Sequence, residues 1–142
     1  MVRLVLGIIA GIVAAFATIW AVDLVGQLLK PIPSGLDIYD YQAVRAYIKT
    51  MPPWSLALVA LAWLLGALVG GLVAGTITRR PWAVMLIGLL VILGGVANVM
   101  MIPHPVVLQI AAVVAPALGT LIAIRILRRR GGFARPARET AM

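Results

Sequence analysis

Residues 54–78 read WSLALVALAWLLGALVGGLVAGTIT, a run of 25 residues without a single charged side chain. A helix of that length is about 38 Å long at 1.5 Å per residue, and the hydrocarbon core of a bilayer is roughly 30 Å thick. The run therefore predicts a helix that crosses a membrane.

Three further apolar runs accompany this one, at about residues 4–29, 82–102 and 105–127. Proline marks their limits, because it disfavours a helical residue before it and is tolerated in the first turn. We therefore expect an all-α membrane protein. It should be a four-transmembrane-helix bundle forming one domain over residues 1–130, with an outer loop at 30–53 and a short basic tail at 131–142.

Composition excludes several other classes of protein. Hydrophobic residues make up 63% of the chain and charged residues 11%, whereas soluble domains average about 45–50% and 25%. The chain has no cysteine, one histidine and four acidic residues, so we expect no disulfide, no metal site and no cofactor. Arg3 and the apolar residues after it resemble a signal peptide, but the run continues to Leu29, which favours a retained first helix.

The basic residues are distributed unevenly about the four runs. Nine of the twelve flank the side that carries both termini: Arg3, Arg79, Arg80, Arg125, Arg128, Arg129, Arg130, Arg135 and Arg138. The other three, Lys30, Arg45 and Lys49, lie in or beside the outer loop. Because cytoplasmic loops carry an excess of arginine and lysine, we expect a bacterial inner-membrane protein with cytoplasmic N- and C-termini. The arginine cluster near the C-terminus favours contact with anionic lipid and not with nucleic acid.

Small residues recur at four-residue intervals on three of the runs. Such faces let helix backbones approach closely where no water separates the helices. The run at 54–78 carries two adjacent small faces, so we expect it to contact two neighbours. The glycines expected to pack helices are Gly66, Gly70, Gly71, Gly75 and Gly119. A homo-oligomer or a membrane-protein partner joined through one of these faces is the alternative.

The loop between the first two runs contains an amphipathic segment. Tyr41, Val44, Ile48 and Met51 recur at helical spacing, and Asp40 can accept hydrogen bonds from a first turn. We expect a short helix on the outer membrane surface that covers the end of the bundle. The alternatives are a gate over a pocket and a docking surface for a partner.

Five polar residues fall in or beside the outer halves of the runs, where lipid makes polar side chains costly. They are Asp23, Gln27, Asn98, His104 and Gln109. We expect them to form a polar cluster beneath the short helix. A histidine facing Asp23 would form a pair that responds to pH near neutrality. The alternative is that each residue caps a helix end and meets water separately.

Two segments carry a resemblance. The segments Asp23…Gln27…Pro31-Ile32-Pro33-Ser34-Gly35-Leu36-Asp37 and Asn98…Ile102-Pro103-His104-Pro105 resemble a class of small uncharacterised four-span bacterial inner-membrane proteins. The resemblance spans most of the chain and implies no activity.

Signatures of catalysis are sparse in this sequence. Neither Ser34 nor Ser55 lies in a G-x-S-x-G setting, and no phosphate-binding loop is present. We therefore expect a non-enzymatic protein, either an accessory subunit or a small transporter-like protein with a shallow polar pocket facing outward. The alternative is a membrane enzyme or lipid-binding protein that acts on an amphiphilic substrate through Asp23 and His104. A pocket that encloses both residues between apolar walls would favour this alternative, and a continuous polar path to the cytoplasm would favour transport.

Overall fold

The computed structural model describes residues 1–133, which form five helices and no strand. Four are long and apolar enough to cross a membrane: α1 (Val2–Leu29), α3 (Pro53–Thr78), α4 (Pro81–Met101) and α5 (Val106–Arg129). The fifth, α2 (Tyr41–Lys49), is short and lies in the chain between α1 and α3. The expected all-α bundle with a short helix in its first loop is therefore confirmed. Tail residues 134–142, which include Arg135 and Arg138, lie outside the described residues.

The helix limits follow the prolines closely. Pro53 and Pro81 stand in the first turns of α3 and α4, where a missing N–H leaves no helical hydrogen bond unmade. Pro105 is the N-cap of α5 and not its first residue, and α5 runs two residues past the expected end, to Arg129. Differences of this size are within the spread of helix-boundary definitions.

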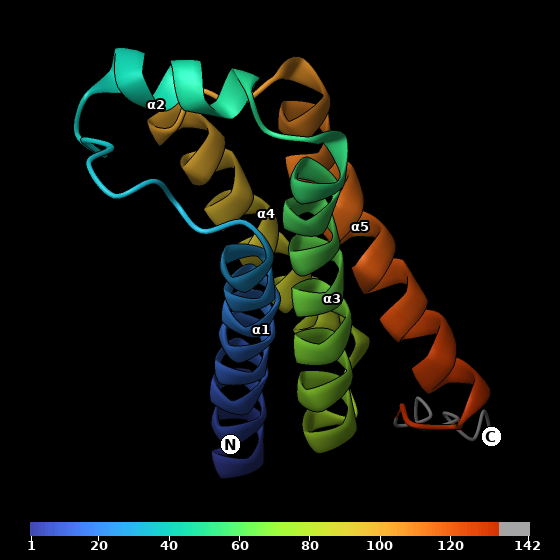
Figure 1. Cartoon of the computed structure of the whole chain (residues 1–142). Coiled ribbons are helices and arrows are strands. Elements are labelled where there is room, and N and C mark those ends of the chain that lie inside the picture. Colours follow the sequence, from blue (N-terminus) through green and yellow to red (C-terminus); the bar gives the residue numbers. More distant parts are fainter. Residues whose placement is uncertain (134–142) are drawn as a thin grey trace, which may run out of the picture.

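α3 is the central helix of the bundle. It packs against α1, α4 and α5, whereas α1 touches α4 only sparsely. Figure 1 shows that α1 begins and α5 ends at the same end of the bundle, and that α2 crosses the opposite end. We call these the terminal end and the α2 end.

The two small faces of α3 serve different neighbours. On one face, a Cβ built on Gly70 would lie 2.7 Å from the carbonyl oxygen of Gly11 in α1. On the adjacent face, a Cβ on Gly71 would lie 2.9 Å from Val84 of α4 and 3.3 Å from Ala123 of α5. Real Cβ atoms essentially never lie within 3.0 Å of a heavy atom of a neighbouring helix, so a side chain at Gly70 or Gly71 would push the helices apart. These glycines therefore allow α3 to contact helices on both sides.

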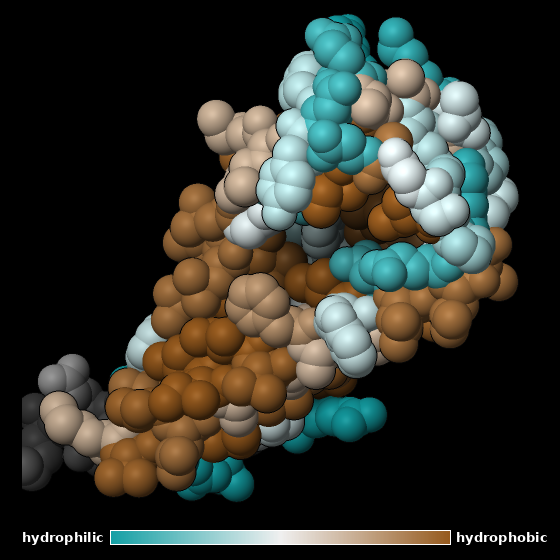
Figure 2. Space-filling model, turned by 60° about the vertical axis from the view of Figure 1, so that its left-hand side comes forward, coloured by the Kyte–Doolittle hydropathy of each residue, from teal (hydrophilic) through white to brown (hydrophobic). Residues whose placement is uncertain are grey.

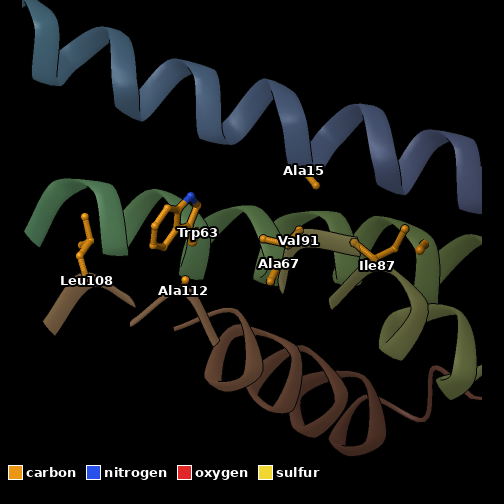
Figure 3. Close-up of a cluster of buried hydrophobic side chains, with 8 residues drawn as sticks. Ala15, Trp63, Ala67, Ile87, Val91, Leu108 and Ala112 are labelled. Atoms are coloured by element: carbon orange, nitrogen blue, oxygen red, sulfur yellow. The ribbon is translucent and has the colours of Figure 1, made fainter. Parts of the chain in front are cut away.

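The main hydrophobic cluster draws side chains from all four long helices (Figure 3). The labelled members are Ala15, Trp63, Ala67, Ile87, Val91, Leu108 and Ala112. Trp63 is the largest of them and only 6% exposed. Its indole nitrogen points towards α1 in Figure 3. This side chain therefore lies between α1 and the rest of the core.

Candidate functional site

α2 forms a roof over one end of the bundle (Figure 1). Its first turn is capped as expected, because the Asp40 carboxylate accepts hydrogen bonds from the backbone N–H groups of Gln42 (2.9 Å) and Ala43 (3.3 Å). Thr50 closes the other end, its hydroxyl donating to the Tyr47 carbonyl at 2.7 Å. The roof is thus a properly terminated helix.

The face that α2 turns to the bundle differs in part from the expected one. Val44, Tyr47 and Ile48 are partly buried, whereas Tyr41 is 52% exposed. Tyr41 lies at the edge of this face, where it lines a neighbouring space together with Ile48 and Met51. Successive helical residues are about 100° apart, so a face centred between Val44 and Tyr47 leaves Tyr41 at its edge.

Lys30 ties the end of α1 to the end of α2. Its ammonium donates a hydrogen bond to the Thr50 carbonyl at 3.3 Å and lies 5.4 Å from the centroid of the Tyr47 ring. The second contact is within the range of a cation–π interaction. Lys30 therefore holds the roof over the bundle and is itself occupied by these contacts.

Beneath α2 lies a space of about 370 Å³, which we call the roof cavity. Asp23, Gln27, Asn98 and His104 all line it, together with apolar side chains of α1, α2 and α3. Four of the five polar residues predicted to cluster therefore share one space. Figure 2 shows a hollow at this end of the molecule whose rim is largely hydrophilic and whose interior is hydrophobic.

A second space of about 210 Å³ runs between α1 and α4, and we call it the lateral groove. Its walls are apolar, with Ile12 and Phe16 on α1 and Leu90 on α4 among them. It exists because α1 and α4 both pack on α3 but hardly on each other. A Cβ placed on Gly94 would meet no atom within 4 Å, so this glycine leaves the groove open.

The roof cavity and the lateral groove adjoin one another. Asp23, Trp63 and Asn98 line both spaces, from α1, α3 and α4 respectively. From Ile12 to Asp23 the groove follows eleven residues of α1, about 16 Å at the helical rise. Half of a hydrocarbon core is about 15 Å thick. The length of the groove along α1 therefore about equals the thickness of the hydrocarbon region of one leaflet.

Two charged side chains of the described chain line these adjoining spaces, Asp23 and Lys30. Asp23 lines both of them and is partly buried. His104 places its Nδ1 2.8 Å from the carbonyl oxygen of Ile102. A carbonyl can only accept, so Nδ1 carries the proton and a neutral ring keeps Nε2 as an acceptor. Within residues 1–133 no hydrogen bond or ion pair joins Asp23 to His104, although both face the same cavity.

Gln109 stands apart from the other four predicted residues. Its Nε2 donates to the His104 carbonyl oxygen at 3.0 Å, which closes the turn between α4 and α5. It lines a neighbouring space on the other edge of α2, with Arg45 and Lys49, and does not line the roof cavity. The geometry of Gln109 therefore fits the alternative interpretation, in which the residue caps a helix end and takes no part in the polar cluster.

Tyr47 is a site residue that sequence reasoning missed. Its hydroxyl is buried beside the roof cavity and has no hydrogen-bond partner in the described part of the chain. Leaving a buried donor without a partner costs about 1–3 kcal/mol. The position could have been found from the sequence, because it falls three residues after Val44 and therefore on the same helical face.

The described residues contain no group of three or more histidine, cysteine, aspartate or glutamate side chains placed to hold a metal ion. Comparisons with protein-family models, with curated proteins and with solved structures find no match for the chain. Its function therefore has to be inferred from the geometry of its own cavities.

Proposed function

We propose that the protein binds an amphiphilic molecule of the membrane, with the polar head in the roof cavity and one acyl chain in the lateral groove. One observation carries this proposal: the two spaces share Asp23, Trp63 and Asn98, so a cavity that carries polar side chains adjoins an apolar slot. Asp23 and His104 both line the roof cavity, together with apolar side chains, and such a pocket favours a lipid-binding protein over a transporter.

The dimensions support a chain-shaped ligand. The roof cavity and the groove together fall within the range of about 300–1,000 Å³ that small-molecule sites occupy. The groove opens beside Phe16, which is 69% exposed on the face of α1 that would meet lipid. A chain can therefore enter sideways from the bilayer without crossing the packed core.

The polar groups match a head that forms hydrogen bonds. Asp23 on α1 and Asn98 on α4 line both spaces, and the unpartnered hydroxyl of Tyr47 lies beside the roof cavity in α2. A carboxylate accepts, while a phenol and an amide each donate and accept. A head carrying hydroxyl, amine or amide groups can satisfy all three.

Binding is better supported than conduction. Thr18, Thr78 and Thr120 each donate their hydroxyl to the carbonyl oxygen four residues earlier, at 2.7–2.8 Å. These hydroxyls are thereby turned to their own helices and not to a shared path through the bundle. A ligand that remains in the outer leaflet needs no such path.

The proposal places α2 outside the cell and both termini in the cytoplasm. In that orientation Arg125, Arg128 and Arg129 would face anionic lipid of the inner leaflet. We expect alkaline phosphatase fused after Met142 to be inactive in cells, and the same enzyme inserted after Gly35 to be active. An active fusion at the C-terminus would overturn the orientation.

Replacement of Tyr47 by phenylalanine separates a ligand role from a structural one. In lipid-free detergent, Tyr47→Phe should melt at the parent's temperature or higher, because it removes a buried hydroxyl whose lack of a partner costs about 1–3 kcal/mol. Native mass spectrometry of freshly extracted protein should nevertheless show less bound lipid than in the parent.

The matched control for this experiment is Tyr39→Phe, because Tyr39 is 92% exposed and lines neither the roof cavity nor the lateral groove. This control should retain lipid as the parent does. A Tyr47→Phe protein that melts lower without lipid and retains the full amount of lipid would contradict the ligand role.

A further inference from the structure

A separate space of about 570 Å³ lies along the other edge of α2, and we call it the basic chamber. It is bounded by α2, by the start of α3 and by the turn between α4 and α5. Its charged lining residues are Arg45 and Lys49, both on α2. His104 also lines it, so this side chain stands on the border between the basic chamber and the roof cavity.

The two cations of the chamber are not neutralised by nearby acids. Arg45 and Lys49 are four residues apart, so they lie one turn apart on the same side of α2, where like charges destabilise a helix. Within residues 1–133 no acidic side chain lines the chamber and no ion pair involves either cation. Asp37 and Asp40, the acids of the loop before α2, accept hydrogen bonds from backbone N–H groups of their own segment.

The remaining lining defines the shape of a ligand. The chamber is also lined by apolar side chains, among them Leu56, Val99 and Val106. A guanidinium matches the oxygens of a phosphate in two parallel hydrogen bonds, and an ammonium supplies a compact second charge. An anion with three or more oxygens that carries an apolar or glycerol substituent would meet both the cations and these apolar side chains.

We infer that the basic chamber binds a phosphate-bearing group, with Arg45 and Lys49 as its ligands. The site is independent of the proposed function, because neither cation lines the roof cavity or the lateral groove. The phosphate can belong to a phospholipid headgroup or to a soluble ester, since both present the same oxygens.

The experiment uses the full chain in an uncharged maltoside detergent at constant ionic strength. Thermal unfolding is followed during separate titrations with inorganic phosphate and with phosphatidylglycerol. Arg45→Gln and Lys49→Gln should each weaken the apparent affinity about tenfold, as expected for the loss of one charge-assisted contact. Arg80→Gln is the matched control, because Arg80 is exposed at the terminal end and its replacement removes the same positive charge.

Each outcome has a definite meaning. Stabilisation by both probes, weakened in Arg45→Gln and Lys49→Gln, supports a site for any phosphate. Stabilisation by phosphatidylglycerol alone, weakened in the same variants, supports a lipid headgroup as the source. No stabilisation by either probe, or equal stabilisation in all three variants, overturns the inference. Lipid retention in the lateral groove is measured separately, so failure here is distinguishable from failure of the proposed function.

Discussion

Gly119→Ala is expected to destabilise the bundle severely, although it adds a single methyl group. A Cβ at Gly119 of α5 would overlap the carbonyl oxygen of Leu64 and lie 3.1 Å from the backbone nitrogen of Leu68, both in α3. Side chains can rotate away from such a contact, but backbone atoms cannot. Overpacking costs about 1–3 kcal/mol and occasionally more, so we expect a loss of about 3 kcal/mol.

Gly94→Ala is the matched control for this first prediction. The added methyl meets nothing within 4 Å, and alanine forms helices better than glycine by about 0.8–1 kcal/mol. The control should therefore melt at the parent's temperature or above it. Fluorescence-detected size-exclusion chromatography after heating in detergent measures both variants. Equal melting of Gly119→Ala and the parent would show that α3 and α5 are not packed as described.

The second large effect is expected from Gly94→Leu, which fills the lateral groove without disturbing the packing of the helices. Gly94 lines the groove and has open space where its side chain would be. A leucine there should remove about ten atom contacts between the groove and a bound chain, at about 0.1–0.2 kcal/mol each, since packing and not exclusion of water holds a chain inside the bilayer. Binding should then weaken about tenfold, and the melting temperature without lipid should not fall.

Ala97→Leu provides the control for this variant. Ala97 is exposed on α4 and lines none of the spaces described above. A leucine at this position therefore adds a large side chain on a face of α4 that meets only bulk lipid. Lipid per protein, quantified after extraction, should fall in Gly94→Leu and stay unchanged in Ala97→Leu. Equal lipid retention by the two variants would be incompatible with a chain in the groove.

Local signals explain why the helices could be predicted from the sequence. Each span is long and apolar, and prolines such as Pro53 and Pro81 mark where helices begin. The cap of α2 by Asp40 depends on residues two and three positions away, so it too is encoded locally. Helix limits were therefore correct to within one or two residues.

The lateral groove could not be predicted, because it depends on how two helices pack on a third. The small-residue pattern indicates that α3 contacts neighbours on two faces, but it does not indicate that α1 and α4 remain apart. The role of Gly94 in keeping the groove open also depends on that separation. No repeat or spacing in the sequence reports it.

The candidate site could be anticipated in part. Asp23 and Asn98 lie towards the α2 ends of α1 and α4, two helices that run in the same direction, so their position along the spans was enough to place them in one space. A hydrogen-bonded pair of Asp23 and His104 could not be predicted in this way, because the histidine ring contacts the carbonyl of its own turn. Tyr47 and Lys30 meet only because the loop after α1 returns over the bundle, and loop paths are poorly encoded in sequence patterns.

The central claim is that an acyl chain occupies the lateral groove, and quenching of Trp63 by brominated acyl chains tests it most directly. Trp63 is 6% exposed and lines the groove, whereas Trp20 is 69% exposed on α1. Each can be made the only tryptophan by replacing the others with phenylalanine, and the proteins are reconstituted in brominated lipid. We predict that Trp63 is quenched despite its burial, that Gly94→Leu abolishes this quenching, and that Trp20 is quenched in both backgrounds. Emission from Trp63 that brominated lipid leaves unchanged, while Trp20 is quenched, would contradict the claim.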